Sequence, residues 1–228
     1  MHWIDPDSLP EQEGTVERFV LNPHGEIDGF VMLNRETDAP NLVHTPPHME
    51  TDLIRHVKTG ETVRVRAVRP RHAALLAAVA VTAQSGTRIV DEGPDDEREH
   101  PKFEKRKMTA AAKVRLSLFG PKGELRGALL ADGTAVRIGP KEAKDFAALL
   151  KPGAALAVSG DGIETSYGRV IHAKELGPEP GKLRPVKDKH EPGPKHKHPH
   201  DPKHDQKHGS KHGPKHGPKH ERDDEAHA

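Results

Sequence analysis

The chain has 228 residues, with 36 Lys and Arg against 35 Asp and Glu, and a formal net charge of +1 at pH 7. This balance gives no overall attraction to nucleic acid or to an anionic membrane. Because the chain contains no cysteine, it has no disulfide framework, no thiolate nucleophile and no cysteine-ligated zinc. Hydrophobic residues make up only 32% of the chain, and the shortage is concentrated after Leu176. We therefore expect a folded part followed by a polar tail.

The beginning of the chain, MHWIDPDSLPEQEG, is acidic. It lacks the basic stretch and the following apolar stretch of a secretory signal. No apolar run in the sequence reaches the length needed to span a bilayer. We expect a cytoplasmic protein that does not associate with a membrane.

Two segments of the chain repeat one pattern of turns and apolar residues. The first set of matching positions, which keeps one fixed offset, pairs Pro23, Gly25, Glu26 and Gly29 with Pro121, Gly123, Glu124 and Gly127. The second set pairs Pro47, Lys58 and Gly60 with Pro140, Lys151 and Gly153. The offset falls by five between the two sets, which places a small insertion of the first copy within residues 34–41. The repeat predicts two small domains.

The elements of the first copy follow from its apolar spacing. We expect strands over residues 16–21, 26–33, 42–45 and 61–68, a helix over 48–57 and a last strand within 73–83. Asn22, Pro23, His24 and Gly25 are typical of a tight turn. Gly29 lies inside the second strand, where a glycine indicates the bulge or bend that closes a small barrel.

The last strand of the first copy is ambiguous by itself. Residues 73–83 are rich in Ala and Leu, which also favours a helix. The counterpart in the second copy, residues 169–176, follows Gly168 and is β-branched at Val170 and Ile171. Since homologous segments adopt one structure, we predict a strand in both copies.

The order of three strands, a helix and two strands, found twice, resembles the OB-fold, a five-stranded Greek-key barrel. The resemblance covers about residues 14–86 and 112–177 and rests on topology and hydrophobic pattern. It implies a mainly β protein made of two tandem OB-like barrels. We assign residues 14–90 and 112–178 to the barrels, 91–111 to a charged linker and 179–228 to a disordered tail. An SH3-like barrel is the alternative, but that fold does not naturally use an amphipathic helix here.

OB-folds bind single-stranded nucleic acid or oligosaccharide on strands two and three and on the loops that join strands one to two and four to five. The candidate phosphate contacts in the first copy are Arg64, Arg66, Arg69 and Arg71. Only 3% of the residues are aromatic, which disfavours base stacking. The alternative reading is a solvated strand face whose arginines have Glu17 and Glu61 as acidic neighbours.

The tail contains ten of the 18 histidines. The candidate metal ligands are His196, His198, His200, His204, His208, His212, His216 and His220. Interleaved Gly and Pro exclude a stable helix, so any chelation comes from a flexible chain. Neutral imidazole suits divalent Ni, Zn, Cu and Co. The composition of about residues 187–220 resembles the His-rich extensions of bacterial nickel metallochaperones and metal-storage proteins, which implies metal handling or storage.

Two alternatives to a metal-binding tail stay open: a soluble spacer expanded by repetition, and a polybasic arm that contacts nucleic acid.

Elsewhere, His24, His44 and His48 suggest a folded metal site. In the second copy, however, Lys122 takes the place of His24 and Lys141 takes the place of His48. We therefore interpret His24 and His48 as exposed loop and cap residues. The sequence has no phosphate-binding Gly loop, dinucleotide fingerprint, His-Glu-x-x-His motif or nucleophile elbow, so we expect a binding protein and not an enzyme.

Overall fold

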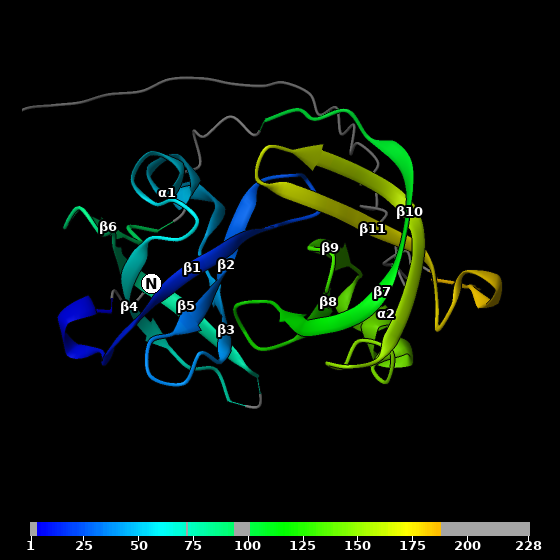
Figure 1. Cartoon of the computed structure of the whole chain (residues 1–228), viewed down its shortest axis with the longest axis horizontal. Helices are drawn as coiled ribbons and strands as arrows, with labels where there is room; N and C mark the ends of the chain where they lie inside the picture. Colours follow the sequence, from blue (N-terminus) through cyan, green and yellow to red (C-terminus); the bar gives the residue numbers. More distant parts are fainter. Residues whose placement is uncertain (1–3, 72, 94–100, 188–228) are drawn as a thin grey trace, which may run out of the picture. The chain divides into compact units, whose positions relative to one another are not determined.

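The computed structural model describes residues 4–71, 73–93 and 101–187. The elements of its first half are η1 (Pro6–Ser8), β1 (Glu11–Leu21), β2 (Ile27–Asn34), β3 (Pro40–His44), η2 (Pro47–Met49), α1 (Glu50–His56), β4 (Thr62–Val68), β5 (Leu75–Thr82) and β6 (Arg88–Val90). Those of its second half are β7 (Arg106–Phe119), β8 (Leu125–Leu130), β9 (Thr134–Arg137), α2 (Pro140–Ala143), η3 (Lys144–Phe146), β10 (Ala155–Thr165), β11 (Gly168–Gly177), η4 (Pro180–Lys182) and β12 (Arg184–Pro185). Figure 1 shows these elements along the chain.

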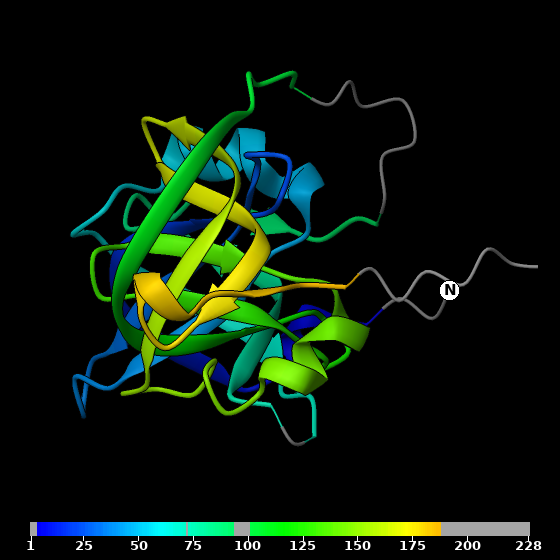
Figure 2. The same ribbon diagram turned by 90° about the vertical axis from the view of Figure 1, so that its right-hand side faces the viewer.

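The two halves form two closed five-stranded barrels, which confirms the predicted fold class. In barrel 1, defined as β1 to β5, the strands pair in the order β3-β2-β1-β4-β5, and a parallel pairing of β3 with β5 closes the ring. In barrel 2, defined as β7 to β11, the equivalent parallel pairing joins β9 to β11. This topology fits an OB-like small barrel. Figure 2 shows β7, in green, as one long curved strand of barrel 2.

The strand registers confirm the alignment of the two copies. Gly29 pairs with His44 in barrel 1, and Gly127 pairs with Arg137 in barrel 2. The β1–β2 and β7–β8 pairings also shift register at the same place, with Glu17 and Arg115 as the extra residues. The insertion of the first copy lies in the loop of residues 35–39 between β2 and β3, as its polar sequence indicates.

The ambiguous Ala/Leu-rich segment is a strand. Leu75–Thr82 pairs with both β3 and β4, and its side chains are buried in a β-like pattern. The expected helix is also present, as η2 followed by α1. It packs on the core of barrel 1 through Met49 and Leu53, and through Val57 at its C-cap. Tertiary pairing therefore overrides helix propensity in β5.

Each barrel encloses apolar side chains, and the two barrels also share an apolar contact. Barrel 2 has a core cluster of its own, which includes Val136, Leu156 and Ile171. The core cluster of barrel 1 extends to residues of barrel 2, namely Leu118, Leu129, Ala135, Ile163 and Val170. The two barrels are thus separate closed sheets joined by buried apolar side chains.

Some ordered elements extend beyond the expected domain limits. β1 begins at Glu11 and β7 at Arg106, so part of the expected linker is strand. Beyond residue 178, η4 and β12 are formed, β12 pairs with β11, and Val186 packs against the core of barrel 2. No helix within the described ranges is long and apolar enough to cross a membrane.

Candidate functional site

The predicted metal ligands of the tail, His196 to His220, lie outside the described residues. Within residues 4–71, 73–93 and 101–187, no group of three or more His, Asp and Glu side chains is arranged to hold a metal ion. The three histidines considered for a folded site do not form one there. His48 binds the carboxylate of Asp91 through Nε2 at 2.9 Å, and His24 lines a separate pocket at the first hairpin.

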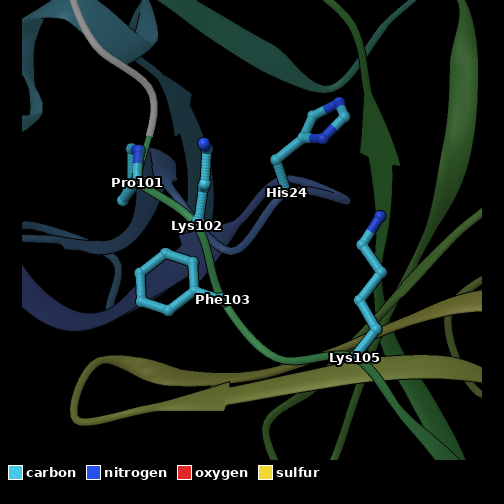
Figure 3. Close-up of a pocket in the computed structure, with 5 residues that line it drawn as sticks. All are labelled: His24, Pro101, Lys102, Phe103 and Lys105. Atoms are coloured by element: carbon cyan, nitrogen blue, oxygen red, sulfur yellow. The ribbon is translucent and has the colours of Figure 1, made fainter.

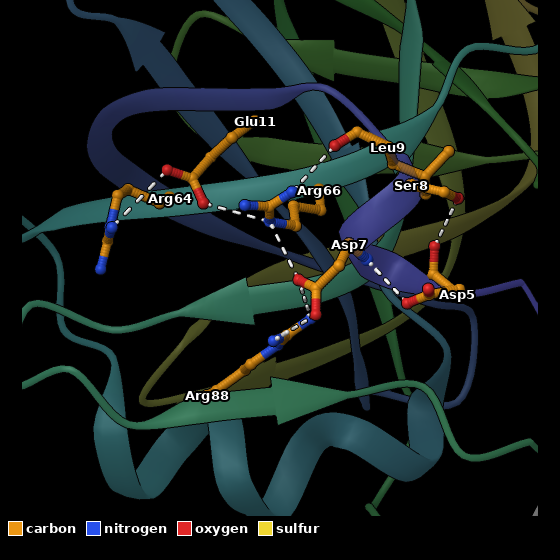
Figure 4. Close-up of polar contacts among 8 residues, drawn as sticks. All are labelled: Asp5, Asp7, Ser8, Leu9, Glu11, Arg64, Arg66 and Arg88. Carbon is orange, nitrogen blue, oxygen red and sulfur yellow. Dashed lines mark hydrogen bonds and ion pairs between the residues drawn. The ribbon is translucent and has the colours of Figure 1, made fainter.

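Arg64 and Arg66 are paired with carboxylates near the start of the chain (Figure 4). Arg64 lies 3.6 Å from Glu11, and Arg66 lies 3.2 Å from Glu11 and 3.8 Å from Asp7. Arg66 also donates a hydrogen bond to the backbone carbonyl of Leu9 at 3.0 Å. The strand β4 therefore presents neutralised arginines. Their partners differ from Glu17 and Glu61, the acidic neighbours expected from the sequence.

The same acidic segment also holds Arg88. The guanidinium of Arg88 lies 2.9 Å from Asp7, and its hydrogen bond holds the pKa of Asp7 below its usual value. Asp5 caps η1 by accepting a hydrogen bond from the backbone N–H of Asp7 at 2.9 Å. These contacts join the residues before β1 to β4 and β6, which gives the acidic start of the chain a structural role.

The other two candidate arginines lie after β4. Arg69 donates a hydrogen bond to Gln12 at 2.7 Å, and Arg71 is exposed in the loop before β5. The structure does not bring the four arginines together as one unpaired stripe. Neither Arg69 nor Arg71 forms a side-chain ion pair with any described residue.

The outer face of strands two and three, where OB-folds bind ligands, is covered in barrel 1. Asp28 on β2 lies 2.6 Å from the guanidinium of Arg137 on β9, and the two side chains are only 14% and 7% exposed. Arg137 also donates from Nε to the backbone carbonyl of Leu21 at 2.9 Å. Because Arg137 is the counterpart of His44, equivalent strands of the two barrels meet at this face.

His44 is half-buried beside this ion pair. Burial lowers the pKa of His44 below its ordinary value; the Arg137 guanidinium acts in the same direction and the Asp28 carboxylate against it. A buried imidazole next to an arginine is disfavoured as a cation. The environment therefore favours neutral His44 in the folded protein.

The first hairpin loop of each barrel meets the end of the fourth strand, or the loop that follows it, in the other barrel. A side chain at Gly25 would lie 2.9 Å from Ile163, at the end of barrel 2. A side chain at Gly123, its counterpart, would lie 3.3 Å from Ala73 of barrel 1. The loops that contact ligands in OB-folds are thus grouped in two equivalent pairs.

A basic pocket of about 460 Å³ lies beside the first of these loop pairs. Its lining residues are His24, Pro101, Lys102, Phe103 and Lys105. In Figure 3 the nitrogen-bearing ends of His24, Lys102 and Lys105 point the same way, while the ring of Phe103 turns aside. Among the described residues, no acidic side chain lines this pocket.

The aromatic residues mostly serve packing. Phe19, Phe30 and Phe146 are buried in the cores of the barrels. Tyr167 contacts the ring of Phe19 edge-on, with the ring centroids 5.8 Å apart. Phe103 is 38% exposed, which makes it one of few exposed large apolar side chains in the described part of the chain.

Sequence reasoning missed the basic pocket and the Asp28–Arg137 pair. The basic run of residues 102–107 was visible, but only as half of a charged linker. Nothing in the spacing of Asp28 and Arg137 indicates that they meet, because the contact joins residues of different repeats.

No protein-family model matches this sequence, and the comparison with curated proteins found no relative.

Proposed function

We propose that this protein binds divalent transition metal ions through the histidines of residues 196–220. The observation that carries the proposal is the recurrence of His at every fourth position from His204 to His220. Several neutral imidazoles at this close spacing in the sequence form a polydentate ligand set for Ni, Zn, Cu or Co. In this proposal the two barrels form the folded body of a metal-handling or metal-storage protein.

Two features of the described residues support the assignment of metal binding to the tail. They contain no cluster of His, Asp and Glu able to hold a metal ion. The histidine at the barrel interface, His44, is influenced by the guanidinium of Arg137, which disfavours a second cation there. Metal chemistry therefore has its candidate ligands after residue 187.

The nucleic-acid alternative on the β4 arginines receives less support. Arg64 and Arg66 already have carboxylate partners, so phosphate contacts would have to displace Glu11 and Asp7. We therefore do not assign Arg64 and Arg66 to a nucleic-acid site.

Isothermal titration of the full chain with Ni²⁺ and Zn²⁺ tests the proposal. The test variant replaces His204, His208, His212, His216 and His220 with Gln. The matched control replaces the lysine that precedes each of them, namely Lys203, Lys207, Lys211, Lys215 and Lys219, with Gln. The histidine variant should lose most of the bound metal, whereas the lysine variant should bind at least as tightly because cationic repulsion is reduced. Equal metal uptake by the histidine variant and the natural chain would contradict the proposal.

A further inference from the structure

The basic pocket beside the first hairpin has the properties of an anion site. Three cationic or proton-donating side chains, His24, Lys102 and Lys105, line it together with the apolar Pro101 and Phe103. Its volume of about 460 Å³ falls within the range of about 300–1,000 Å³ of small-molecule sites. Its lining residues include none of the paired arginines of β4.

Neighbouring basic residues of the same run are already neutralised. Arg106 forms an ion pair with Glu164, and Lys107 lies 2.7 Å from Asp161, so both are bound to carboxylates of β10. Lys102 and Lys105 form no ion pair with any described residue. The run therefore divides into residues that fix it to barrel 2 and residues whose ammonium groups are available to a ligand.

The segment that carries these lysines is held on both sides. The ring of Phe103 lies against the first hairpin, since a side chain at Gly25 would lie only 2.7 Å from Cδ2 of Phe103. The absence of a Cβ at Gly25, whose φ is +87°, makes room for this ring. Arg106 and Lys107 fix the other end of this segment to β10. Lys102 and Lys105 are therefore held at the pocket that His24 also lines.

We propose that His24, Lys102 and Lys105 form a phosphate-binding site, with Phe103 as the positioning residue that holds the lysines beside the hairpin. Ammonium groups bind phosphate as point charges, and one ring nitrogen of His24 donates a hydrogen bond in either tautomer. The same chemistry fits the phosphates of a nucleic-acid strand and a free polyphosphate. The site goes beyond the proposed metal binding and uses none of its residues.

The test uses the full chain in EDTA, so that metal binding by the tail does not contribute. The probes are inorganic pyrophosphate and a single-stranded oligothymidylate of eight residues. The test variant is Lys102→Gln/Lys105→Gln. The matched control is Lys141→Gln/Lys144→Gln, which removes the same charge from a pocket of about 470 Å³ on barrel 2 that has no aromatic lining.

The test variant should bind pyrophosphate at least tenfold more weakly than the natural chain, whereas the control should stay within twofold. If the site takes strand phosphates, the salt dependence of oligothymidylate binding should also fall, by about 1.4 in log–log slope for two lost contacts on a single strand. Weakening of pyrophosphate binding alone supports a free phosphate ligand. Weakening of both supports a site that also accepts a strand.

Amide resonances identify where the probe binds. The proposal expects pyrophosphate to shift the resonances of residues 24–25 and 102–105 in the natural chain. Shifts confined to the tail, or equal affinity of the two double variants, would overturn it. Phe103→Ala should weaken binding and Phe103→Trp should retain it, because an aromatic ring still rests on Gly25; equal binding by Phe103→Ala would remove the positioning role.

Discussion

Glu17 and Arg115 occupy the same position in the two copies, and their side chains form an ion pair of 2.5 Å with each other. A residue that contacts its own counterpart lies near an axis of approximate two-fold symmetry, as in a symmetric dimer. Two copies of barrel 1 joined in this way would bring two carboxylates together, and two copies of barrel 2 would bring two guanidinium groups together. The opposite charges of Glu17 and Arg115 therefore favour contact between barrel 1 and barrel 2 over contact between two identical barrels.

Reversal of either charge tests this specificity. Glu17→Arg or Arg115→Glu places like charges at a contact that is only 20–31% exposed, and each should lower the free energy of unfolding by about 1–2 kcal/mol. The exchanged variant Glu17→Arg/Arg115→Glu should recover most of this loss. Urea unfolding of the full chain measures the three values. A direct interaction would be excluded if the exchanged variant had an unfolding free energy as low as that of the less stable single variant.

The Asp28–Arg137 pair should be more sensitive, because it is more deeply buried. Arg137→Leu leaves the Asp28 carboxylate without its partner and should cost about 3 kcal/mol of unfolding free energy. Asp28→Leu should have a similar effect on the isolated guanidinium. The double variant should be much less destabilised than the sum of the two, since no charge remains buried. Additive losses in urea unfolding would mean that the two side chains act independently.

His44 should make the fold sensitive to acid. Its pKa in the folded state lies below the ordinary value of 6.5, so the unfolded chain takes up the proton first. Stability contributed by neutral His44 is therefore present above about pH 6.5 and is lost as the pH falls below that value. His44→Gln should show a smaller loss of stability than the natural chain between pH 7 and pH 5.

The two mid-strand glycines should differ in their tolerance of a side chain. A Cβ at Gly29 would overlap the carbonyl oxygen of Val43, and one at Gly127 would overlap that of Val136. Gly127 also has a φ of +145°, which adds backbone strain. We expect Gly127→Ala to cost about 3 kcal/mol or more and Gly29→Ala less. Gly153→Ala, whose Cβ meets no atom within 4 Å, should cost about 1 kcal/mol. Urea unfolding of the three variants of the full chain measures these losses.

Metal binding by the tail should depend steeply on pH. Imidazole has an ordinary pKa of about 6.5, so protons compete with metal for the same nitrogens. We expect the Ni²⁺ affinity of the full chain to fall at least tenfold between pH 7.5 and pH 5.5, measured by titration with a competing chelator. Removal of metal with EDTA should leave the unfolding midpoint of the barrels unchanged, because the described residues hold no metal cluster. A midpoint that falls in EDTA would place a metal inside the folded part.

The amino-acid sequence by itself determined the duplication, the strand order and most element positions. Gly29 and Gly127 marked the equivalent bends, and Pro47 and Pro140 marked the starts of the helical segments in both copies. These features could be predicted because hydrophobic period, turn residues and glycine positions are local properties of the chain. The comparison of copies also settled β5, whose own composition favours a helix.

Only the tertiary structure decided which faces remain available for binding. The pairing of Arg66 with Glu11 and Asp7, the meeting of Asp28 with Arg137 and the packing of Phe103 on Gly25 join segments far apart in the chain. Each depends on how the barrels and their connecting segment pack, and side-chain contacts at long sequence separation leave no periodic signal. For that reason the sequence indicated basic residues as candidates, and the structure showed which of them carboxylates already neutralise.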